Sequence, residues 1–447
     1  MIKRAFLSMI AMLILVVIVG GAVFLVTRNH QRATLDIAAV EGTNPQIVKP
    51  RTGLIPLFKI AKPIGWKPNE TPAAAAGLKV QAFADKLDHP RWMLALPNGD
   101  VLVAETNAPP KPDDNEGFSG WVETQLQQDA GANAKSANRI TLLRDTNGDG
   151  IADQRSVLVS GLNSPFGMAV VGDQLYVADT DALLRFPFKA GDTRITAKPY
   201  KLVDLPAGRV NHHWTKNVIA SPDGSKLYVA VGSNSNVGDR GNAAEEGRAA
   251  IWEVDAKTGS HRIYAYGIRN PVGLGWEPST NQLWVVVNER DGLGSDLVPD
   301  YLTSVQFGGF YGWPWYYWGG YSDNRPKGPP PELVQDTVIT PDYALGAHTA
   351  SLGLTFATGE TLGPNYADGA FIGQHGSWNR DPLSGYKVVF VKFRKGKPVG
   401  KPFDVLTGFL TPKGEAHGRP VGVVIAKDGS LLVADDVGNR IWRVSAR

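Results

Sequence analysis

The sequence predicts an all-β protein: a six-bladed β-propeller preceded by an N-terminal transmembrane helix. A strand–turn–strand unit recurs six times, tight-turn dipeptides mark the tips of the units, and one long uncharged run stands before them. Gly 50 and Pro 31 among 447 residues also suit many short strands joined by turns. The formal net charge of +3 gives no reason to expect nucleic acid, and the absence of cysteine excludes disulfides and thiolate metal sites.

The uncharged run extends from Ala5 to Val26 and follows Lys3 and Arg4. It is long enough to cross a bilayer core of about 30 Å as a helix. No small-residue cleavage pattern closes it, so we expect an uncleaved signal anchor over residues 1–27, with a removed signal peptide as the alternative. The anchor predicts a single-pass protein of the inner membrane whose remaining chain lies on the periplasmic side.

Residues 28–77 are predicted to be a Pro/Ala-rich tether between the anchor and the folded domain. No hydrophobic period persists there, and the stretch ends in Ala73 to Ala76. Prolines recur at Pro45, Pro50, Pro56, Pro63, Pro68 and Pro72.

The repeated unit consists of an apolar strand, a turn dipeptide, a second strand and a polar tail. Its copies begin at Met93, Gly167, Asn217, Gly273, Gly353 and Gly422. The tips Asn98-Gly99, Asp223-Gly224 and Asp428-Gly429 are strong hairpin signals. Spacings of roughly 50 to 80 residues leave room for one four-stranded blade per unit, so we expect six blades over residues 78–447.

Two strands without partners support this closure. Arg440 to Val444 lacks a fourth strand and Leu78 to Phe83 is spare, so the two are expected to complete one blade together. A β-sandwich or two smaller β domains would be the alternative, but no break in composition divides the six copies.

The polar tails are expected to meet on one face, because each second strand ends, and each antiparallel first strand begins, at the same edge of its blade. The residues that lead into the first strands add polar groups to this face at Arg91, His213, Lys216, Arg269, Asn270, His348 and Arg419. One mouth of the propeller is therefore the predicted binding site.

Simpler explanations stay open for single segments. Arg269 and Asn270 could cap a strand, and His212, His213 and Trp214 could form a packed aromatic corner. The aromatic run GGFYGWPWYYWGGY, residues 308–321, suits either a stacking wall for a cofactor or sugar or packing between blades.

A separate motif spaces oxygen-bearing side chains around a glycine turn. Its members are Asp145, Asn147, Asp149 and Asp153. The alternation suits Ca²⁺ in a structural role, and a turn rich in Asx hydrogen bonds is the alternative.

Three segments together resemble the soluble glucose and sorbosone dehydrogenases that depend on pyrroloquinoline quinone (PQQ). They are GRVNHHWTKNVIASPDGSKLYVAVGS, YAYGIRNPVGLGW, and NERDGLGSD followed by GGFYGWP. The sequence is most similar to the sorbosone-dehydrogenase-like and aldose-sugar-dehydrogenase-like members, over roughly Leu78 to Arg447. The resemblance implies a six-bladed propeller that uses PQQ and Ca²⁺ to oxidise an aldose or aldehyde-type sugar. Electrons would pass to a quinone or small carrier in the membrane or periplasm.

The resemblance also implies roles for individual residues. His213 would be the general base, and Arg269 would polarise the quinone oxygen. The cofactor would be bound by Asn270, Lys216, His348, Arg380 and Arg419. Backbone carbonyls of Arg290, Asp291 and Gly292 would bind the calcium ion held with the cofactor.

The chain departs from the glucose-oxidising members at two positions. Ser233 stands where those enzymes have the carboxylate that orients the base, and His348 is the nearest candidate for their PQQ-binding lysine. Two other classes remain as alternatives: a Ca²⁺-dependent lactonase-type hydrolase propeller and a non-catalytic propeller that binds carbohydrate or protein. The HWTKN and RNP motifs favour the dehydrogenase.

Overall fold

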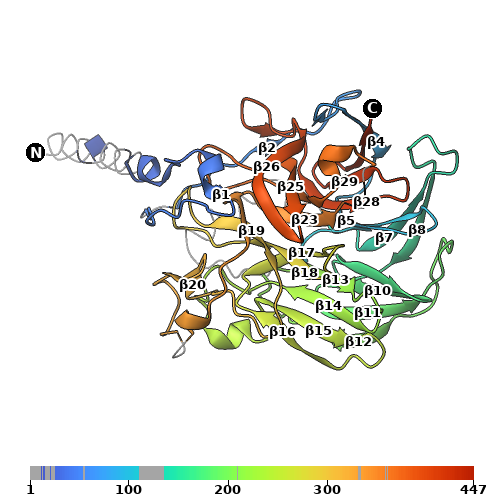
Figure 1. Cartoon of the computed structure of the whole chain (residues 1–447), viewed down its shortest axis with the longest axis horizontal. Helices are drawn as coiled ribbons and strands as arrows, with labels where there is room; N and C mark the ends of the chain where they lie inside the picture. The colour runs from blue at the N-terminus through green and yellow to red at the C-terminus, as the bar shows by residue number, and fades with distance from the viewer. Residues whose placement is uncertain are drawn as a thin grey trace, which may run out of the picture.

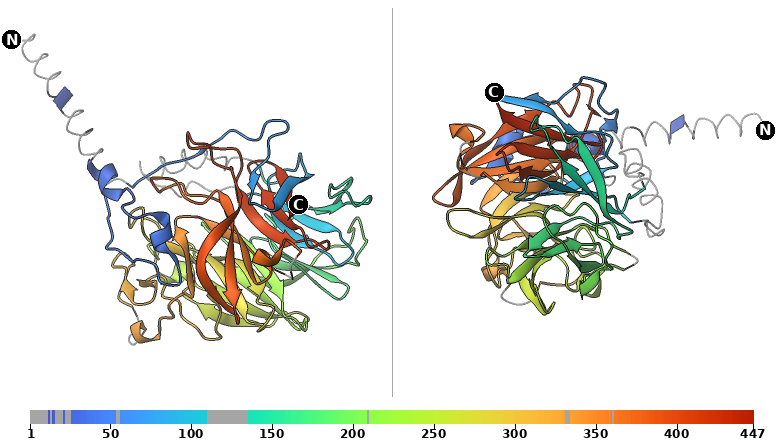
Figure 2. Two further views of the ribbon diagram at one scale, coloured as in Figure 1. Left: turned by 45° about the horizontal axis from the view of Figure 1, so that its top comes forward. Right: turned by 90° about the vertical axis from the view of Figure 1, so that its right-hand side faces the viewer.

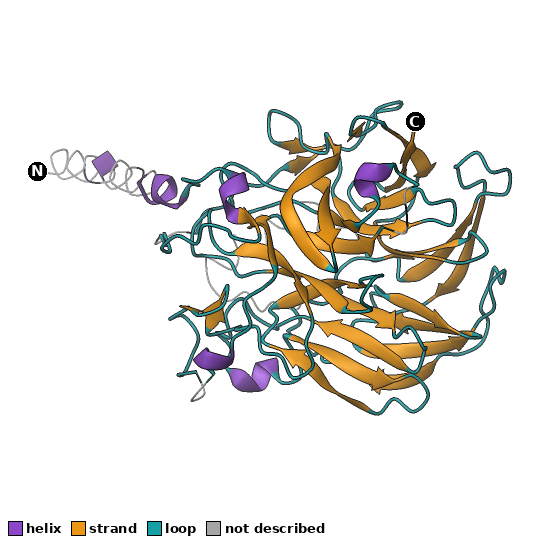
Figure 3. Ribbon diagram, viewed as in Figure 1, coloured by secondary structure: helices purple, strands orange, loops and turns teal. Residues whose placement is uncertain are grey.

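The computed structural model describes residues 12, 14–15, 21, 26–53, 56–109, 135–208, 210–330, 334–357, 359 and 361–447. Strands dominate it, and the helical segments are short (Figure 3). The four 3₁₀ helices of the described chain are η1 (Ile37–Val40), η3 (Asn242–Glu245), η4 (Gln335–Thr337) and η5 (Pro364–Tyr366).

Six antiparallel sheets form the six predicted blades (Figure 1). Blade 1 comprises β5 (Pro90–Ala95), β6 (Val101–Glu105), β7 (Arg139–Arg144) and β8 (Gln154–Ser160). Blade 2 comprises β9 (Met168–Val171), β10 (Gln174–Ala178), β11 (Ala182–Pro187) and β12 (Tyr200–Asp204). Blade 3 comprises β13 (Lys216–Ala220), β14 (Lys226–Val231), β15 (Ala250–Asp255) and β16 (His261–Tyr266). Blade 4 comprises β17 (Asn270–Trp276), β18 (Leu283–Asn288), β19 (Pro299–Ser304) and β22 (Tyr343–Ala347). Blade 5 comprises β23 (Ser351–Phe356), β24 (Gly369–Gln374), β25 (Lys387–Arg394) and β26 (Lys397–Thr407). Blade 6 comprises β28 (Pro420–Ile425), β29 (Leu431–Asp435), β30 (Arg440–Ala446) and β4 (Leu78–Ala84).

The ring closes as the sequence predicts. The first strands contact one another in the order β5, β9, β13, β17, β23, β28 and back to β5. The last strand, β30, pairs with β4 from Ile441↔Ala84 to Ala446↔Leu78, so the two ends of the propeller share blade 6. The three predicted hairpin tips join β5 to β6, β13 to β14 and β28 to β29. The six-bladed propeller is confirmed.

The strands differ in burial according to their place in the blade. Second strands such as β6 and β29 are buried at every position, whereas the outer strand β16 is mostly exposed. A strand near the axis has a neighbouring blade on each face, so an uninterrupted apolar run is favoured there. Buried apolar side chains of the described chain form six clusters between neighbouring blades. These clusters hold the ring rigid around its axis.

Residues 28–77 are expected to be a tether, but the described parts, residues 28–53 and 56–77, pack along the propeller instead. Figures 1 and 2 show this blue segment running over the blades to β4. It adds β1 (Glu41–Gly42) to blade 4 and β3 (Ala73–Ala74) to blade 5, and β2 (Lys62–Pro63) pairs with β27 (Glu415–Ala416). Its prolines fit because these strands are two residues long and require few ladder hydrogen bonds.

The predicted transmembrane helix lies largely outside the described residues. Within the part of the chain that is described, no helix is long and apolar enough to cross a membrane. A further small sheet, β20 (Tyr316–Tyr317) with β21 (Tyr321–Ser322), lies in the aromatic run.

Candidate active site

A cavity of about 640 Å³ opens at the mouth where the polar tails converge. Its lining includes tail residues from blades 1, 3, 4, 5 and 6, as predicted. The tail of blade 2 does not reach it, because Asp179 accepts the backbone N–H of Asn163 at 2.8 Å. The volume falls within the range of small-molecule sites.

The imidazole of His213 is held in one tautomer. Its Nδ1 lies 2.8 Å from the carbonyl oxygen of Ser233 and 3.0 Å from the Ser233 hydroxyl. That hydroxyl donates to the carbonyl of Ser235 at 2.7 Å. Since a carbonyl can only accept, the proton is on Nδ1, and Nε2 keeps its lone pair. Burial, followed by the charge of Arg269, lowers the pKa of His213 well below its ordinary value. His213 is therefore a neutral acceptor at the pocket.

Both adjacent histidines line the cavity, whereas strand alternation predicts that only one of His212 and His213 faces the mouth. That prediction is wrong because β13 begins only at Lys216. The two histidines lie in the turn before it, where side chains do not alternate between faces.

Arg269 is buried at the pocket wall with all its donors engaged by protein. Nε donates to the carbonyl of Asn236 at 3.1 Å, and the terminal nitrogens donate to Asn288, Glu289, Asn236 and Asp291. Five N–H groups thus meet five acceptors. In this structure Arg269 acts by charge and by positioning its neighbours.

Asn270 differs from Arg269 because one of its polar atoms is engaged by none of the described residues. It is buried, and among the described side chains its Oδ1 atom has no hydrogen-bond partner. The close approach of Gly232 makes room for it: a Cβ at Gly232 would lie 2.5 Å from Asn270 Oδ1 and 2.5 Å from His213 Cβ. A buried amide oxygen without a partner is a candidate ligand contact.

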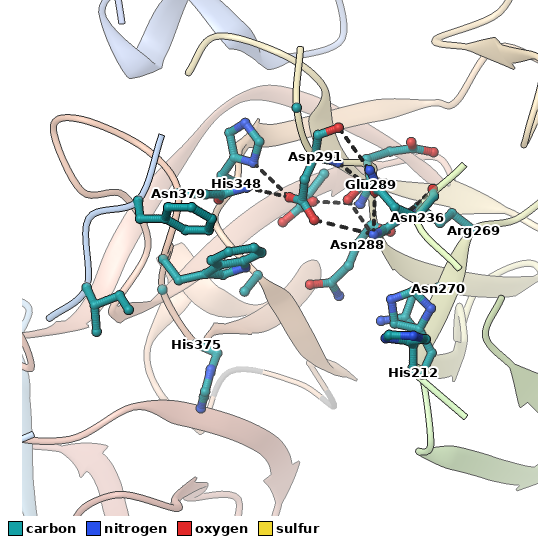
Figure 4. Close-up of a pocket in the computed structure, with 18 of the residues that line it drawn as sticks. His212, Asn236, Arg269, Asn270, Asn288, Glu289, Asp291, His348, His375 and Asn379 are labelled. Atoms are coloured by element: carbon teal, nitrogen blue, oxygen red, sulfur yellow. Dashed lines mark hydrogen bonds and ion pairs between the residues drawn. The ribbon is translucent and has the colours of Figure 1, made fainter. Parts of the chain in front are cut away.

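An ion-pair network joins blades 4 and 5 across the pocket (Figure 4). Asp291 accepts Nδ2 of Asn379 at 2.7 Å, and its carboxylate lies 3.3 Å from His348 Nδ1 and 3.4 Å from Arg269. Burial would raise the pKa of Asp291, but the His348 hydrogen bond and the Arg269 charge hold it at about 2.

His348 is the cation of this network. Its Nε2 lies 3.0 Å from the carbonyl of Gly294, so both ring nitrogens face oxygen atoms. Burial lowers the pKa of His348, but the contact with Asp291 outweighs burial and raises it above its ordinary value. His348 therefore lines the pocket as predicted but is committed to Asp291.

A second ionic cluster, centred on Asp436, lines the pocket from blades 6, 1 and 5. Asp436 accepts from Arg91 at 2.8 Å and from His375 at 2.9 Å, and His89 lies 3.5 Å away. Burial opposes the charge of Asp436, but these three partners keep its pKa well below the usual range.

Two predicted cofactor contacts are not in the pocket lining. Lys216 is fully buried and donates to the carbonyls of Trp214 and His213 at 3.2 and 3.4 Å, because its side chain turns back under the histidine turn. Arg380 donates to the carbonyls of Ser295 and Pro382 behind the wall. Both predictions are corrected: these two side chains brace the site from behind. Arg419, in contrast, lines it.

The predicted calcium carbonyls are only partly in place. Asp291 and Gly292 line the pocket, but the carbonyl oxygen of Asp291 already accepts Asn236 Nδ2 at 3.1 Å and Arg325 at 2.6 Å. A carbonyl has two lone pairs, so none is left there for a metal ion. The Arg290 side chain is buried away from the pocket, donating to Pro314 and Tyr316.

The aromatic run packs between blades. Tyr311, Trp313, Tyr316, Tyr317 and Trp318 are all buried, and none of them lines the pocket. Trp313 Nε1 donates to the carbonyl of Asn236 at 3.0 Å. The run thus supports Asn236, which in turn contacts Arg269 and Asp291.

The loop from Asp145 to Asp153 is closed by its own hydrogen bonds. Asp145 accepts the N–H groups of Gly148 and Gly150 at 2.7 and 2.8 Å, and Asp153 accepts from Thr146. Nowhere in the described chain do three or more His, Asp or Glu side chains form a group that could hold a metal ion. The structural calcium loop stays a prediction.

A family model, TrAA12-like, matches residues 72–299 and 332–447, which is most of the chain. The chain belongs to the TrAA12-like family. The predicted resemblance to PQQ-dependent sugar dehydrogenases, and with it the enzyme class, is confirmed at the level of the family. Solved structures of similar fold include a PQQ-bound aldose sugar dehydrogenase from Streptomyces coelicolor, which has a TM-score of 0.53 at 16% identity.

Individual proteins are also similar to this chain. An uncharacterised protein of Borreliella burgdorferi is 29% identical over 300 residues, covering 63% of this chain and 76% of that protein. The PQQ-dependent pyranose dehydrogenase of Coprinopsis cinerea is 25% identical over 293 residues, covering 52% of this chain but only 39% of that enzyme. A calcium structure of the family AA12 enzyme from Trichoderma reesei has a TM-score of 0.67 at 19% identity and covers 87% of this chain and 99% of that one.

The residues of this TrAA12-like pocket fit an anionic quinone cofactor. Four lining residues carry a buried polar atom without a partner among the described groups: Nε of Arg91 and of Arg419, and Oδ1 of Asn270 and of Asn379. Guanidinium N–H groups are suited to carboxylate groups such as the three of PQQ. Arg91, Arg419 and Asn270 are therefore the residues that would hold it.

Asn236, His375 and Asp436 belong to the polar tails that the sequence predicts to meet at the mouth, but the sequence indicates no role for each of them. Their roles depend on contacts between blades, which one repeat does not reveal. The prediction from sequence did not include the pocket residues Pro56, Leu57, Phe58 and Ile60. Aromatic residues such as Phe58 and Trp66 were the available signal, because a solvated linker contains few of them.

Proposed function

We propose that this protein oxidises an aldose or a related aldehyde-type sugar such as sorbosone, in a reaction that depends on PQQ and Ca²⁺. The observation that carries the proposal is the fixed tautomer of His213 in a pocket with unpaired guanidinium N–H groups. His213 has its Nε2 lone pair free at neutral pH, and, among the described residues, Arg91 and Arg419 each have an N–H group left to bind an anionic cofactor.

The side chains divide the work in this proposal. His213 Nε2 accepts the proton of the sugar hydroxyl, and the carbonyl of Ser233 stabilises the imidazolium that forms. Lys216 supports the backbone of this turn by donating to two of its carbonyls. Bound PQQ would supply the two-electron acceptor. Arg91 and Arg419 would hold its carboxylates, and Asn270 would orient it.

Reconstitution tests the proposal. Purified protein is incubated with PQQ and Ca²⁺ and assayed for reduction of an artificial dye with aldoses and ketoaldehydes. Dye reduction that requires both PQQ and a sugar is expected. Hydrolysis of sugar lactones without dye reduction would instead support the lactonase class.

We further propose that the chain is anchored in the inner membrane with its mouth close to the bilayer surface, which favours a membrane quinone as acceptor. The uncharged run ends at Val26, while Arg28 and Arg32 face Asp381 and Gln31 lines the pocket. Only a few residues separate the run from the pocket rim. Membrane fractionation of cells that express the full-length gene checks the anchor. Recovery of the protein in the soluble fraction with residues 1–26 removed would contradict it.

A further inference from the structure

The segment of residues 56–66, here called the strap, supplies part of the pocket wall. Pro56, Leu57, Phe58 and Ile60 line the cavity. This segment precedes the first residue that the family model matches, residue 72. The strap is therefore a wall of the site that the propeller repeats themselves do not provide.

The strap is fastened on both sides of the mouth. Upstream of it, the N–H of Arg51 donates to the carbonyl of Leu293 at 2.9 Å. At its far end Trp66 donates to Asp435 at 2.7 Å and stacks on His417 at 4.9 Å. Between these anchors Ala61 is fully buried. The strap is thus a fixed wall.

Its centre forms an aromatic pair with blade 5. The rings of Phe58 and Trp378 stack with centroids 5.7 Å apart and planes at 29°. The N–H of Lys59 donates to the carbonyl of Trp378 at 2.9 Å, and its ammonium group contacts Asp381. Both rings line the pocket, and Leu57 and Ile60 extend the apolar surface around them. We call these four side chains the aromatic wall.

The remainder of the lining is largely polar, so the pocket has two contrasting sides. Asn379, the residue after Trp378, lies across the pocket from His212 and Asn270 (Figure 4). A pyranose ring has the same two-sided character: C–H groups gather on its faces and hydroxyl groups project around its edge. Aromatic rings bind such C–H faces.

Burial places the two rings of the aromatic wall nearer the entrance than Asn270 and Arg419, two of the three cofactor contacts. Phe58 and Trp378 are half-buried and Pro56 is exposed, whereas Asn270 and Arg419 are buried. A substrate that enters and leaves meets the entrance, and a resident cofactor occupies the depth.

We propose that the aromatic wall binds the apolar face of a pyranose ring and makes the enzyme selective for ring sugars over short open-chain aldehydes. This inference rests on the proposed sugar oxidation and names its substrate class. With one ring face on the wall, the hydroxyl edge of the sugar is turned toward the His213 side of the pocket.

Kinetics of Phe58→Ala and Trp378→Ala test the wall. For D-glucose we expect KM to rise about fivefold to tenfold, the size of a lost aromatic contact, with kcat largely kept. For glyceraldehyde, which has no ring, KM should stay the same. Phe307→Ala is the matched control, since Phe307 is 61% exposed and does not line the pocket. Unchanged KM for glucose in folded variants overturns the proposal.

Two binding measurements separate this proposal from the one it rests on. Saturation-transfer NMR follows glucose binding without turnover, and we expect its signal to weaken in Phe58→Ala. Titration with PQQ should give the same affinity in wild type and variant; weaker PQQ binding with an unchanged glucose KM would show that the wall serves the cofactor. Absence of dye reduction by wild type with any sugar would refute the dehydrogenase alone.

Discussion

His213 is the proposed base, and no carboxylate orients it as in the glucose-oxidising members that the sequence resembles. The Ser233 carbonyl takes the Nδ1 proton, and the Ser233 hydroxyl completes the cradle while donating to Ser235. A neutral acceptor orients the ring but stabilises the imidazolium less than a carboxylate does. The nearby positive charge of Arg269 also disfavours the imidazolium and so lowers the pKa of His213. The proposed base is therefore weak, and its ring is held in one orientation.

His213→Ala should keep the fold and PQQ binding and lose most of the rate, roughly 10² to 10⁴, the usual worth of a general base. His212→Ala is the control and should cost less, because the Ser233 carbonyl orients only its neighbour. Dye-linked turnover at saturating PQQ measures both. Wild-type turnover by His213→Ala would refute the mechanism.

The rate should also persist at mildly acidic pH. The pKa of His213 lies well below its ordinary value, so the free base remains available as pH falls through 6.5. We expect the acid limb of kcat/KM against pH to lie below that value. An acid limb at or above pH 6.5 would show that another group is the base.

His348 and Asp291 form an ion pair whose contribution to stability depends on pH. Because the pKa of His348 is raised in the folded chain, the stabilisation is complete below its unfolded value near 6.5 and is lost as pH rises through the folded pKa. His348→Gln should therefore lower the melting temperature more at pH 5.5 than at pH 9. A deficit that is equal at both pH values would mean that His348 is neutral.

At the scale of elements, the end of β14 and the start of β17 meet where His213 and Asn270 lie. Gly232 follows β14 directly, and its lack of a side chain permits the approach of His213 and Asn270. Its importance is steric, since no unusual backbone angle is required there. The blade edges thus determine the spacing of the site.

Gly232→Ala should displace Asn270 or His213 and reduce kcat/KM by tenfold or more while the propeller stays folded. The new methyl group would stand 2.5 Å from atoms of both residues. Gly320→Ala is the matched control, because its added Cβ would meet nothing within 4 Å. Turnover and circular dichroism of the two variants decide; full activity in Gly232→Ala would show that the site tolerates the shift.

On the scale of the whole molecule, the N-terminal segment and the C-terminal strand hold the ring together. β4 completes blade 6, and the strap crosses the mouth before the chain reaches β4. The segment therefore serves both closure and the site.

Three shortened chains separate these duties. A chain starting at Thr27 should remain folded and active in solution. One starting at Leu78 keeps β4 and should fold with a lower melting temperature and weaker sugar binding, because the strap is gone. One starting at Pro90 leaves the edge of β30 unpaired and should aggregate. Stable, monomeric protein from the third chain would contradict closure by β4.

Local patterns in the sequence were sufficient to predict the blades and their convergence. Alternating strands, Asn-Gly and Asp-Gly tips and polar tails are short-range features, and repetition of one unit indicates a closed ring. His213, Asn270, Arg269 and Arg419 were found because they stand beside first strands. Lys216 and Arg380 were assigned to the pocket because a cation near the mouth looks alike in sequence whether it faces the cavity or the carbonyls behind it.

The sequence by itself determined the fold class and the mouth at which the polar cavity opens, since both follow from residues adjacent along the chain. Only the tertiary structure decided which donors remain free, that Ser233 orients His213 through its carbonyl, and that the strap walls the pocket. These depend on contacts such as Lys59 to Asp381 and Trp66 to Asp435, between residues hundreds of positions apart. Such pairs satisfy one another's polar groups only when the ring has closed, and no local pattern encodes them.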